Sequence, residues 1–202
     1  MSIKKISKFQ PESFEFTKEH LEEMEKEINK YPKNKQASAV MALLYLAQKQ
    51  NDNWLPLSAI KYVAKKLEMP YIKVYEVCTF YSMFNLAPVG KYFVQVCTTT
   101  PCMISGAKGI VDVCKKHISK NENELSNNKL CSWVEVECLG ACVNAPMMQI
   151  NYDYFEDLDE AKAESIIQNI LEDKKVNPGS TKDRKSSAPE KNRLTLISNK
   201  NA

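Results

Sequence analysis

Four cysteines near the middle of the chain occur as two closely spaced pairs, and this pattern limits the fold more than any other feature. Four residues separate Cys97 from Cys102, three separate Cys138 from Cys142, and 35 lie between the pairs. Four thiolates can bind zinc or an iron–sulfur cluster only if the chain brings both pairs together. Disulfides are a third alternative, although the seven cysteines of the chain leave at least one thiol unpaired.

Charge separates a tail from the rest of the chain. Residues 174–202 hold 8 basic and 2 acidic side chains, whereas residues 1–173 hold 20 basic and 23 acidic ones. The basic excess is therefore in the tail and not on the folded body, which argues against a nucleic-acid-binding surface. The tail has too few apolar residues to offset the entropy lost on ordering, so we expect 174–202 to be a disordered basic tail.

The sequence also indicates the cellular compartment of the chain. Residues 1–16 form an N-terminal segment without the apolar run of a secretory signal, and they contain no arginine, which argues against a mitochondrial presequence. The longest nearly apolar run, 37–47, is shorter than the about 20 residues that a membrane-spanning helix needs. We therefore expect no direct membrane insertion and a reducing compartment, where cysteines are metal ligands or buried thiols more often than disulfides.

Residues 17–86 are expected to form a small helical bundle. Apolar side chains recur at helical spacing over 17–30 and 35–50, and again after Pro56. A fourth helix is predicted after Pro70, in YIKVYEVCTFYSMF, although its Val, Tyr and Phe content is typical of strands. Proline is well tolerated at a first helical turn, and three helices precede this segment, which favours a helix here.

Residues 87–173 are expected to form a second domain, which begins at the turn-like sequence APVG. Its predicted elements are a strand over 91–97, a helix over 102–118, a strand over 132–137, a hairpin over 147–155 and a helix over 158–173. The order β-α-β-β-β-α resembles a reduced thioredoxin-like α/β domain. The fold class is thus α+β or α/β, with a small helical bundle followed by this domain.

The cysteine pairs fall at equivalent places in the predicted domain. Cys97 ends one strand and Cys102 begins the following helix, while Cys138 ends the next strand and Cys142 lies in the loop beyond it. Ligands gather at the carboxyl ends of the strands in α/β sheets. If these two strands are parallel neighbours, all four sulfurs converge there.

Several residues near the pairs favour a [2Fe–2S] cluster, in which each pair would hold one iron. The negative charge of such a site would be stabilised by the amino end of the Cys102 helix, by backbone N–H groups and by the hydroxyls of residues 98–100. Gly140 and Ala141 let the backbone approach closely. A zinc site stays open as an alternative, because zinc-binding cysteine pairs typically have two to four intervening residues.

The other three cysteines are expected to be structural. Cys78 and Cys114 lie on apolar helical faces and Cys131 begins a strand, and a buried free cysteine behaves as a small hydrophobic residue. The sequence contains no glycine-rich phosphate-binding loop, and we predict no catalytic residue on this chain.

Two cysteine boxes, CTTTPC and ECLGACVNAPM, and the stretch MPYIKVYEVCTFYSMFNLAPVGKY closely resemble one known family. This is the family of small [2Fe–2S] subunits of the NADH dehydrogenase module of respiratory complex I, whose bacterial form is known as the E subunit. The resemblance covers residues 14–173 and implies a helical amino-terminal part, a thioredoxin-like carboxyl-terminal part and one [2Fe–2S] cluster. The implied ligands are Cys97, Cys102, Cys138 and Cys142. Met103 departs from the family, in which a bulky aromatic residue often follows the second cysteine.

The resemblance also implies a role in respiration. The chain would be an electron-transfer subunit of an NADH–quinone oxidoreductase, without a complete active site of its own, next to the subunit that binds FMN and NADH. Further peripheral-arm subunits would carry electrons on to quinone, coupled to proton translocation. The expected place is the cytoplasmic side of the bacterial inner membrane, or the matrix side in a mitochondrion. The equivalent subunit of an NAD-linked hydrogenase or formate dehydrogenase is the alternative.

Overall fold

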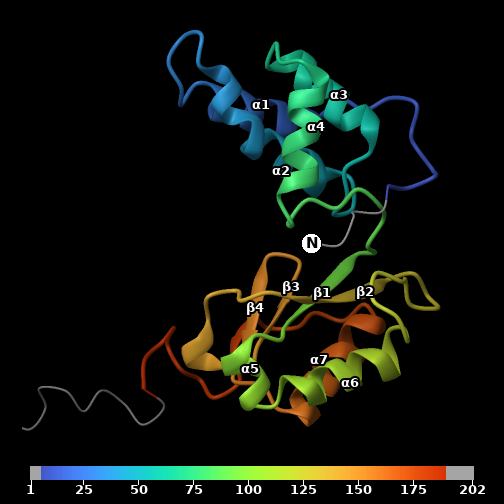
Figure 1. Ribbon diagram of the computed structural model, residues 1–202, viewed down its shortest axis with the longest axis vertical. Helices are drawn as coiled ribbons and strands as arrows, with labels where there is room; N and C mark the ends of the chain where they lie inside the picture. Colours follow the sequence, from blue (N-terminus) through green and yellow to red (C-terminus); the bar gives the residue numbers. More distant parts are fainter. Residues whose placement is uncertain (1–5, 190–202) are drawn as a thin grey trace, which may run out of the picture. The chain divides into compact units, whose positions relative to one another are not determined.

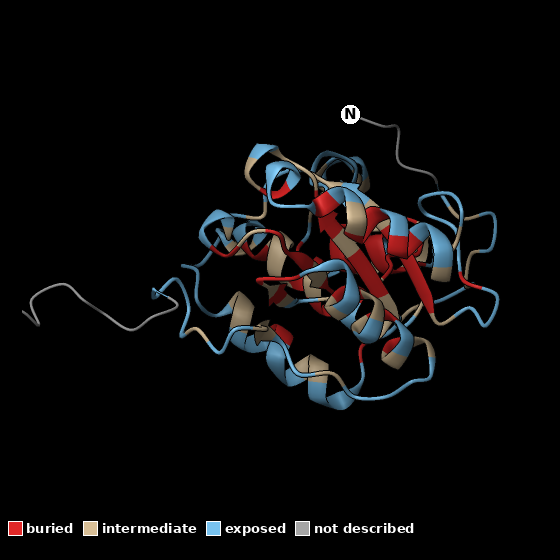
Figure 2. Ribbon diagram, turned by 90° about the horizontal axis from the view of Figure 1, so that it is seen from below, coloured by how far each residue is buried: buried red, intermediate tan, exposed pale blue. Residues whose placement is uncertain are grey.

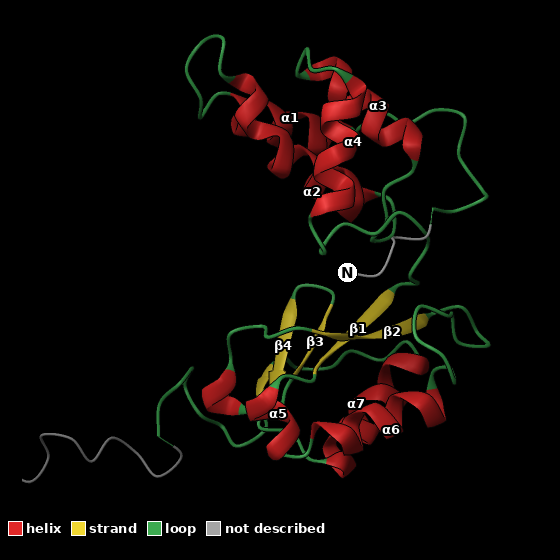
Figure 3. Ribbon diagram, viewed as in Figure 1, coloured by secondary structure: helices red, strands yellow, loops and turns green. Residues whose placement is uncertain are grey.

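Figure 1 shows the computed structural model, which describes residues 6–189 and forms two compact units. The first unit ends at Val89 and the second begins at Gly90. The first is built from helices, and the second from helices and a sheet (Figure 3). No helix within residues 6–189 is long and apolar enough to cross a membrane.

The first unit contains the four α-helices that the sequence predicts, except that the start of the helix expected over 35–50 is a 3-10 helix. Thr17 caps the first of them, because its side chain accepts a hydrogen bond from the N–H of His20. Pro56 and Pro70 directly precede the third and fourth α-helices, where a missing backbone N–H removes no helical hydrogen bond. In chain order the helices are α1 (Lys18–Ile28), the 3-10 helix η1 (Gln36–Ala39), α2 (Val40–Gln50), α3 (Leu57–Lys66) and α4 (Tyr71–Phe80).

Apolar side chains from these helices form one core within the first unit. Leu43 of α2, Ile60 of α3 and Val74 of α4 have no exposed surface, and Met24 of α1 is almost fully buried. Cys78, one helical turn after Val74, packs in the same core. This packing explains why the segment after Pro70 is helical despite its strand-like composition.

The second unit is built on a mixed sheet with the strand order β2-β1-β3-β4-β5. Strand β1 (Tyr92–Cys97) lies between β2 (Cys131–Val136), to which it is parallel, and β3 (Met148–Ile150), to which it is antiparallel. The next strand, β4 (Asp153–Glu156), forms with β3 the hairpin that the sequence predicts. The short strand β5 (Gly179–Ser180) is parallel to β4 and extends the sheet.

Two helices, α6 (Ala107–His117) and α7 (Glu160–Leu171), lie side by side on one face of this sheet, below it in Figure 1. They pack against alternate residues of β1, Val94 and Val96, and against Trp133 of β2. This alternation follows from the two-residue period of a strand. Most of β1 and the first half of β2 are therefore buried, and buried strand segments are red in Figure 2.

The backbone at the start of the second unit requires glycine at position 90. Gly90 has φ +82°, a conformation that L-residues rarely adopt. A Cβ atom there would lie 2.7 Å from the carbonyl oxygen of Leu130. That oxygen already accepts a hydrogen bond from the N–H of Tyr92, so it cannot move away freely.

The prediction of a single helix over 102–118 is wrong in one respect, because the structure has two helices there. The first is α5 (Thr100–Ile104), with Ser105 as its C-cap, and α6 begins after its N-cap Gly106. Gly106 has φ +107°, which breaks the helical path and lets the chain change direction. Periodicity could not show this break, since apolar residues continue on both sides of the glycine.

The prediction that the chain is disordered from Lys174 is wrong for part of that segment. Gly179 and Ser180 form β5, and Arg184 makes an ion pair with Asp157, whose carboxylate is almost completely buried. The segment is ordered mainly by polar contacts, with Val176 as its apolar contact to the core, so hydropathy did not reveal it. Residues 190–202, the rest of the predicted tail, lie outside the described residues.

Candidate functional site

The two cysteine pairs lie at the carboxyl ends of two parallel strands. Cys97 is the last residue of β1 and is paired in register with Val136, the last residue of β2. Cys138 follows two residues later. Cys102 lies in the short helix α5, and Cys142 begins the 3-10 helix η2 (Cys142–Asn144). The parallel pairing that convergence requires is therefore present.

The two pairs differ sharply in their exposure to solvent. Cys97 and Cys102 are each 1% exposed, and they form a small apolar cluster with Ala107 and Met147. Cys138 and Cys142 are exposed, and their sulfur atoms are 3.3 Å apart. The site thus has one half inside the second unit and one half at its surface.

Hydrogen-bond donors from the surrounding loops are directed at the first cysteine of each pair. The Thr99 hydroxyl lies 3.4 Å from Cys97 Sγ, within hydrogen-bonding distance. The Gly140 N–H donates to Cys138 Sγ over 3.4 Å. Among the threonines that the sequence singles out, Thr99 is thus the one whose hydroxyl contacts a ligand sulfur.

These donors favour the thiolate form of the same two cysteines. Burial raises the pKa of Cys97, but hydrogen bonds from the Thr99 side chain and from the Thr99 and Leu139 backbones outweigh it, so the pKa is lowered. The pKa of Cys138 is lowered chiefly by the hydrogen bond from the Gly140 N–H. Thiolate is the form that binds metal.

The second cysteine of each pair is held as a thiol in this arrangement. Burial, together with a hydrogen bond to Cys97, raises the pKa of Cys102 to about 12. The pKa of Cys142 is raised by its hydrogen bond with Cys138, and then by burial. In each pair the first cysteine therefore loses its proton more readily than the second, and metal binding must release the protons that remain.

The sulfurs are arranged as two neighbouring pairs and not as one cage. No group of three or more Cys, His, Asp or Glu side chains within residues 6–189 gathers closely enough to hold a single metal ion. A structural zinc needs four ligands around one ion, whereas the two irons of a [2Fe–2S] cluster can each be held by one thiolate pair. The electrostatic influence of Cys97 reaches both cysteines of the other pair. This donor set fits a [2Fe–2S] cluster better than one zinc ion.

The helix that carries Cys102 contributes less than the sequence predicts. It has five residues, too few for the aligned peptide dipoles of a long helix to act on the site. Backbone groups of the loops take this role, from Leu139 near Cys97, Gly140 near Cys138 and Met147 near Cys102. Loop backbone, with little help from a helix terminus, therefore surrounds the thiols.

The three remaining cysteines belong to other buried clusters, as expected for structural residues. Cys114 of α6 and Cys131 of β2 have no exposed surface and belong to the core between sheet and helices. Burial raises the pKa of each to about 12, which keeps both as unreactive thiols. Cys78 is buried in the core of the first unit.

One residue near the site was missed by sequence reasoning. The Tyr154 hydroxyl of β4 donates a hydrogen bond to the Leu139 carbonyl over 2.6 Å, and Tyr154 packs against the apolar cluster of Cys97 and Cys102. It thereby ties the Cys138 loop to the sheet. A single tyrosine in a predicted hairpin gives no signal of this contact, which depends on the tertiary fold.

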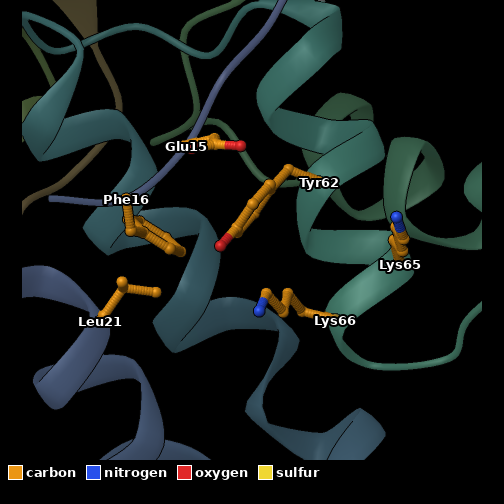
Figure 4. A pocket seen from close by; sticks show the side chains of 6 residues that line it. All are labelled: Glu15, Phe16, Leu21, Tyr62, Lys65 and Lys66. Atoms are coloured by element: carbon orange, nitrogen blue, oxygen red, sulfur yellow. The ribbon is translucent and has the colours of Figure 1, made fainter. Parts of the chain in front are cut away.

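A surface hollow in the first unit offers no comparable chemistry (Figure 4). A ring–cation contact at this hollow places Lys66 Nζ 5.5 Å from the centre of the Tyr62 ring. Its lining includes no cysteine or histidine, and so no set of redox or soft-metal ligands. The side chains that line it are Glu15, Phe16, Leu21, Tyr62, Lys65 and Lys66.

Comparison with known proteins agrees with the site. A sequence model of the thioredoxin-like [2Fe–2S] ferredoxin family matches residues 24–171. The E subunit of the NADH-quinone oxidoreductase of Rickettsia typhi is 54% identical over 161 residues, which cover 80% of this chain and 95% of that protein. Its counterpart in Rickettsia prowazekii is 52% identical over 167 residues, or 83% and 93% of the two chains.

A solved structure shares the fold. The crystal structure of an NAD+-reducing [NiFe]-hydrogenase in the air-oxidized state superposes with a TM-score of 0.56 at 18% sequence identity. The superposition covers 64% of this chain but only 23% of the hydrogenase chain. At this identity the likeness concerns the fold alone, and it confirms the predicted α+β class.

Proposed function

This chain belongs to the thioredoxin-like [2Fe–2S] ferredoxin family, and we propose that it is the [2Fe–2S] electron-transfer subunit of an NADH–quinone oxidoreductase. It carries one [2Fe–2S] cluster within a multi-subunit oxidoreductase. The observation that carries the ligand assignment is the meeting of two thiol pairs at the carboxyl ends of β1 and β2. The proposed ligands are Cys97, Cys102, Cys138 and Cys142.

The chain contributes a defined environment for one-electron chemistry, which the cluster supplies when bound. Thr99 and the loop N–H groups direct positive partial charge at the sulfurs, and this favours extra negative charge at the site. The burial of Cys97 and Cys102 keeps water away from one half. We assign no catalytic side chain to this chain and place the hydride chemistry on a partner.

Apolar side chains exposed around the site support the presence of a protein partner at this surface. Met103, Ile104 and Val143, which follow the second cysteine of each pair, are 45%, 82% and 65% exposed. Apolar residues left in solvent beside a site of this kind are typical of a surface that another protein covers. We assign this surface to the flavoprotein subunit that binds FMN and NADH.

In this assembly the chain accepts single electrons near the flavin, and further peripheral-arm subunits carry electrons on to quinone. Proton translocation is coupled to that transfer in other subunits. The assembly places the chain on the cytoplasmic side of the bacterial inner membrane, or on the matrix side of a mitochondrial one. Attachment to the membrane is through the partner subunits.

Substitution of single cysteines tests the ligand assignment. In anaerobically reconstituted full-length chain, Cys102→Ala or Cys142→Ala should abolish or strongly destabilise the cluster, because one iron loses a thiolate. Cys114→Ala is the matched control, since this cysteine is buried but lies in the other core. Iron and acid-labile sulfide are measured in each variant. Equal cluster loss in all three variants would show that the assignment is wrong.

Co-purification tests the partner. A tagged chain expressed at natural levels should retain a subunit that contains FMN and reduces an artificial acceptor with NADH. Recovery of nickel- or molybdenum-containing subunits in its place would select the alternative, an NAD-linked hydrogenase or formate dehydrogenase. The two Rickettsia relatives, both NADH-quinone oxidoreductase subunits more than 50% identical to this chain, favour the respiratory complex.

A further inference from the structure

The loop that follows Cys142 is held by a segment far along the chain. The Arg184 guanidinium donates a hydrogen bond from Nη2 to the carbonyl oxygen of Val143 over 3.1 Å. The Asn144 side-chain amide donates to the carbonyl oxygen of Ser186 over 2.9 Å. Both loop residues belong to the 3-10 helix η2. Residues 179–186, here called the clasp, therefore contact the chain immediately beside a proposed ligand.

The clasp is itself anchored on one buried carboxylate. The Asp157 side chain is 2% exposed and pairs with both Nε and Nη2 of Arg184, whose side chain is 12% exposed. The Ser180 hydroxyl donates to the same carboxylate over 2.5 Å, and the Thr181 hydroxyl donates to the Asp157 carbonyl. Arg184 also holds the pKa of Asp157 below its usual range, so the carboxylate stays charged.

The contacts between the clasp and the loop form a closed ring. The backbone N–H of Asp157 donates to the Asn144 carbonyl over 2.8 Å. Asp157 thus holds the loop directly through its backbone and, through Arg184, holds the neighbouring Val143 carbonyl. The carbonyl groups of Val143 and Asn144, the two residues after Cys142, are therefore both held through Asp157. The side chain of Cys142 is exposed and lacks the packing that holds the buried pair.

We propose that the clasp positions the Cys142 half of the cluster site, with Arg184 as the positioning residue. This inference rests on the proposed function for the existence of the cluster. Arg184 touches no ligand sulfur and acts through the Val143 carbonyl. Its planar guanidinium can bind the Asp157 carboxylate with two nitrogens and still reach the carbonyl, which a lysine ammonium cannot do. Without this contact the loop gains freedom, and Cys142 leaves its iron more often.

The test compares three variants of the full-length chain with reconstituted [2Fe–2S]. Arg184→Ala removes the contact, Arg184→Lys keeps the charge beside Asp157 without the fork, and Lys185→Ala is a matched control that removes one exposed positive charge from the adjacent residue. The readouts are the rate of iron loss to bathophenanthroline after reduction, the EPR spectrum of the reduced cluster, and thermal unfolding. Amide hydrogen exchange at residues 143–158 of the cluster-free chain is a fourth readout.

For Arg184→Ala we expect iron loss to be about tenfold faster, the low end of the effect of removing an outer-sphere partner of a metal ligand. The EPR spectrum should broaden or shift, and exchange should accelerate at Asp157, whose N–H closes the ring. Arg184→Lys should restore thermal stability but should slow the loss of iron only in part, and Lys185→Ala should match the unsubstituted chain. If Arg184→Ala fails to fold, Arg184→Lys carries the same comparison.

Two results would overturn the proposal. The first is unchanged iron loss and an unchanged EPR spectrum in both Arg184 variants. The second is a lowered melting temperature with those two readouts unchanged, which would make the clasp a stabilising element only. Failure of the unsubstituted chain to form any [2Fe–2S] signal is a different outcome, because it refutes the proposed function and the role of the clasp with it.

Discussion

The Thr99 hydroxyl contacts the sulfur of a proposed ligand, so its removal tests how the chain tunes the cluster. Replacement by valine keeps the size and branching of the side chain and deletes the hydroxyl. The hydroxyl lies 3.4 Å from Cys97 Sγ, where it opposes the effect of burial and helps to lower the pKa of that thiol. Reduction adds negative charge to the cluster, and a donor to sulfur stabilises the reduced state more than the oxidised one. Thr99→Val should therefore lower the reduction potential.

The size of this shift follows from the energy of the contact. A hydrogen bond to a charged group contributes about 1.5–3 kcal/mol net, and only the difference between the two oxidation states enters the potential. A difference of about 1 kcal/mol corresponds to roughly 40 mV, since a tenfold change in a one-electron equilibrium is about 59 mV. We expect a fall on the order of 40 mV.

An EPR-monitored redox titration of the reconstituted chain measures the shift. Thr99→Ser should restore the potential because it returns the hydroxyl. Thr100→Val is the matched control, since this neighbouring threonine is exposed and its substitution should leave the potential unchanged. A potential that is unchanged or raised in Thr99→Val, or an equal fall in the control, would refute the reasoning.

Three further predictions concern stability. Cys114→Ala should lower the free energy of unfolding by about 1 kcal/mol, as for the loss of one buried methyl group, with iron content unchanged; a loss of iron would contradict its structural role. Gly90→Ala should destabilise by more than the about 1–2 kcal/mol of a left-handed residue, because its Cβ would clash with the Leu130 carbonyl; denaturant unfolding with no change in midpoint would count against this. The pKa of Asp157 is lowered by Arg184, so the stability that this carboxylate contributes is present above its ordinary pKa of 3.8 and is lost as pH falls through the lowered value. Thermal unfolding of the unsubstituted chain and of Asp157→Asn should therefore converge in acid, and a gap independent of pH would contradict the ion pair.

The sequence predicts the parts of the site that depend on local pattern. Alternation placed strands over 91–97 and 132–137, close to β1 and β2, and the position of each cysteine pair after a strand predicted their convergence. The helix α4 was predicted against its strand-like composition, because Pro70 suits a helix start and three helices precede it. These features are encoded by neighbours in the chain, so one sequence suffices to read them.

Other features depend on contacts between distant residues and could not be read in this way. The pairing of Asp157 with Arg184 spans 27 positions, and neither residue lies in a motif. It orders a segment whose composition alone indicates disorder. Tyr154 and Leu139 meet only because the hairpin returns beside the Cys138 loop. The break at Gly106 was visible as a glycine, but one glycine inside a helical pattern does not by itself end a helix.

The central claim is that this chain carries one [2Fe–2S] cluster on two pairs of thiolates. The most direct measurement is the quantified EPR spectrum of anaerobically reconstituted, reduced full-length chain, with metal and acid-labile sulfide determined on the same sample. The account predicts one [2Fe–2S] signal of about one spin per chain, with two irons and two sulfides. One zinc per chain, with no iron, no acid-labile sulfide and no EPR signal, would contradict it.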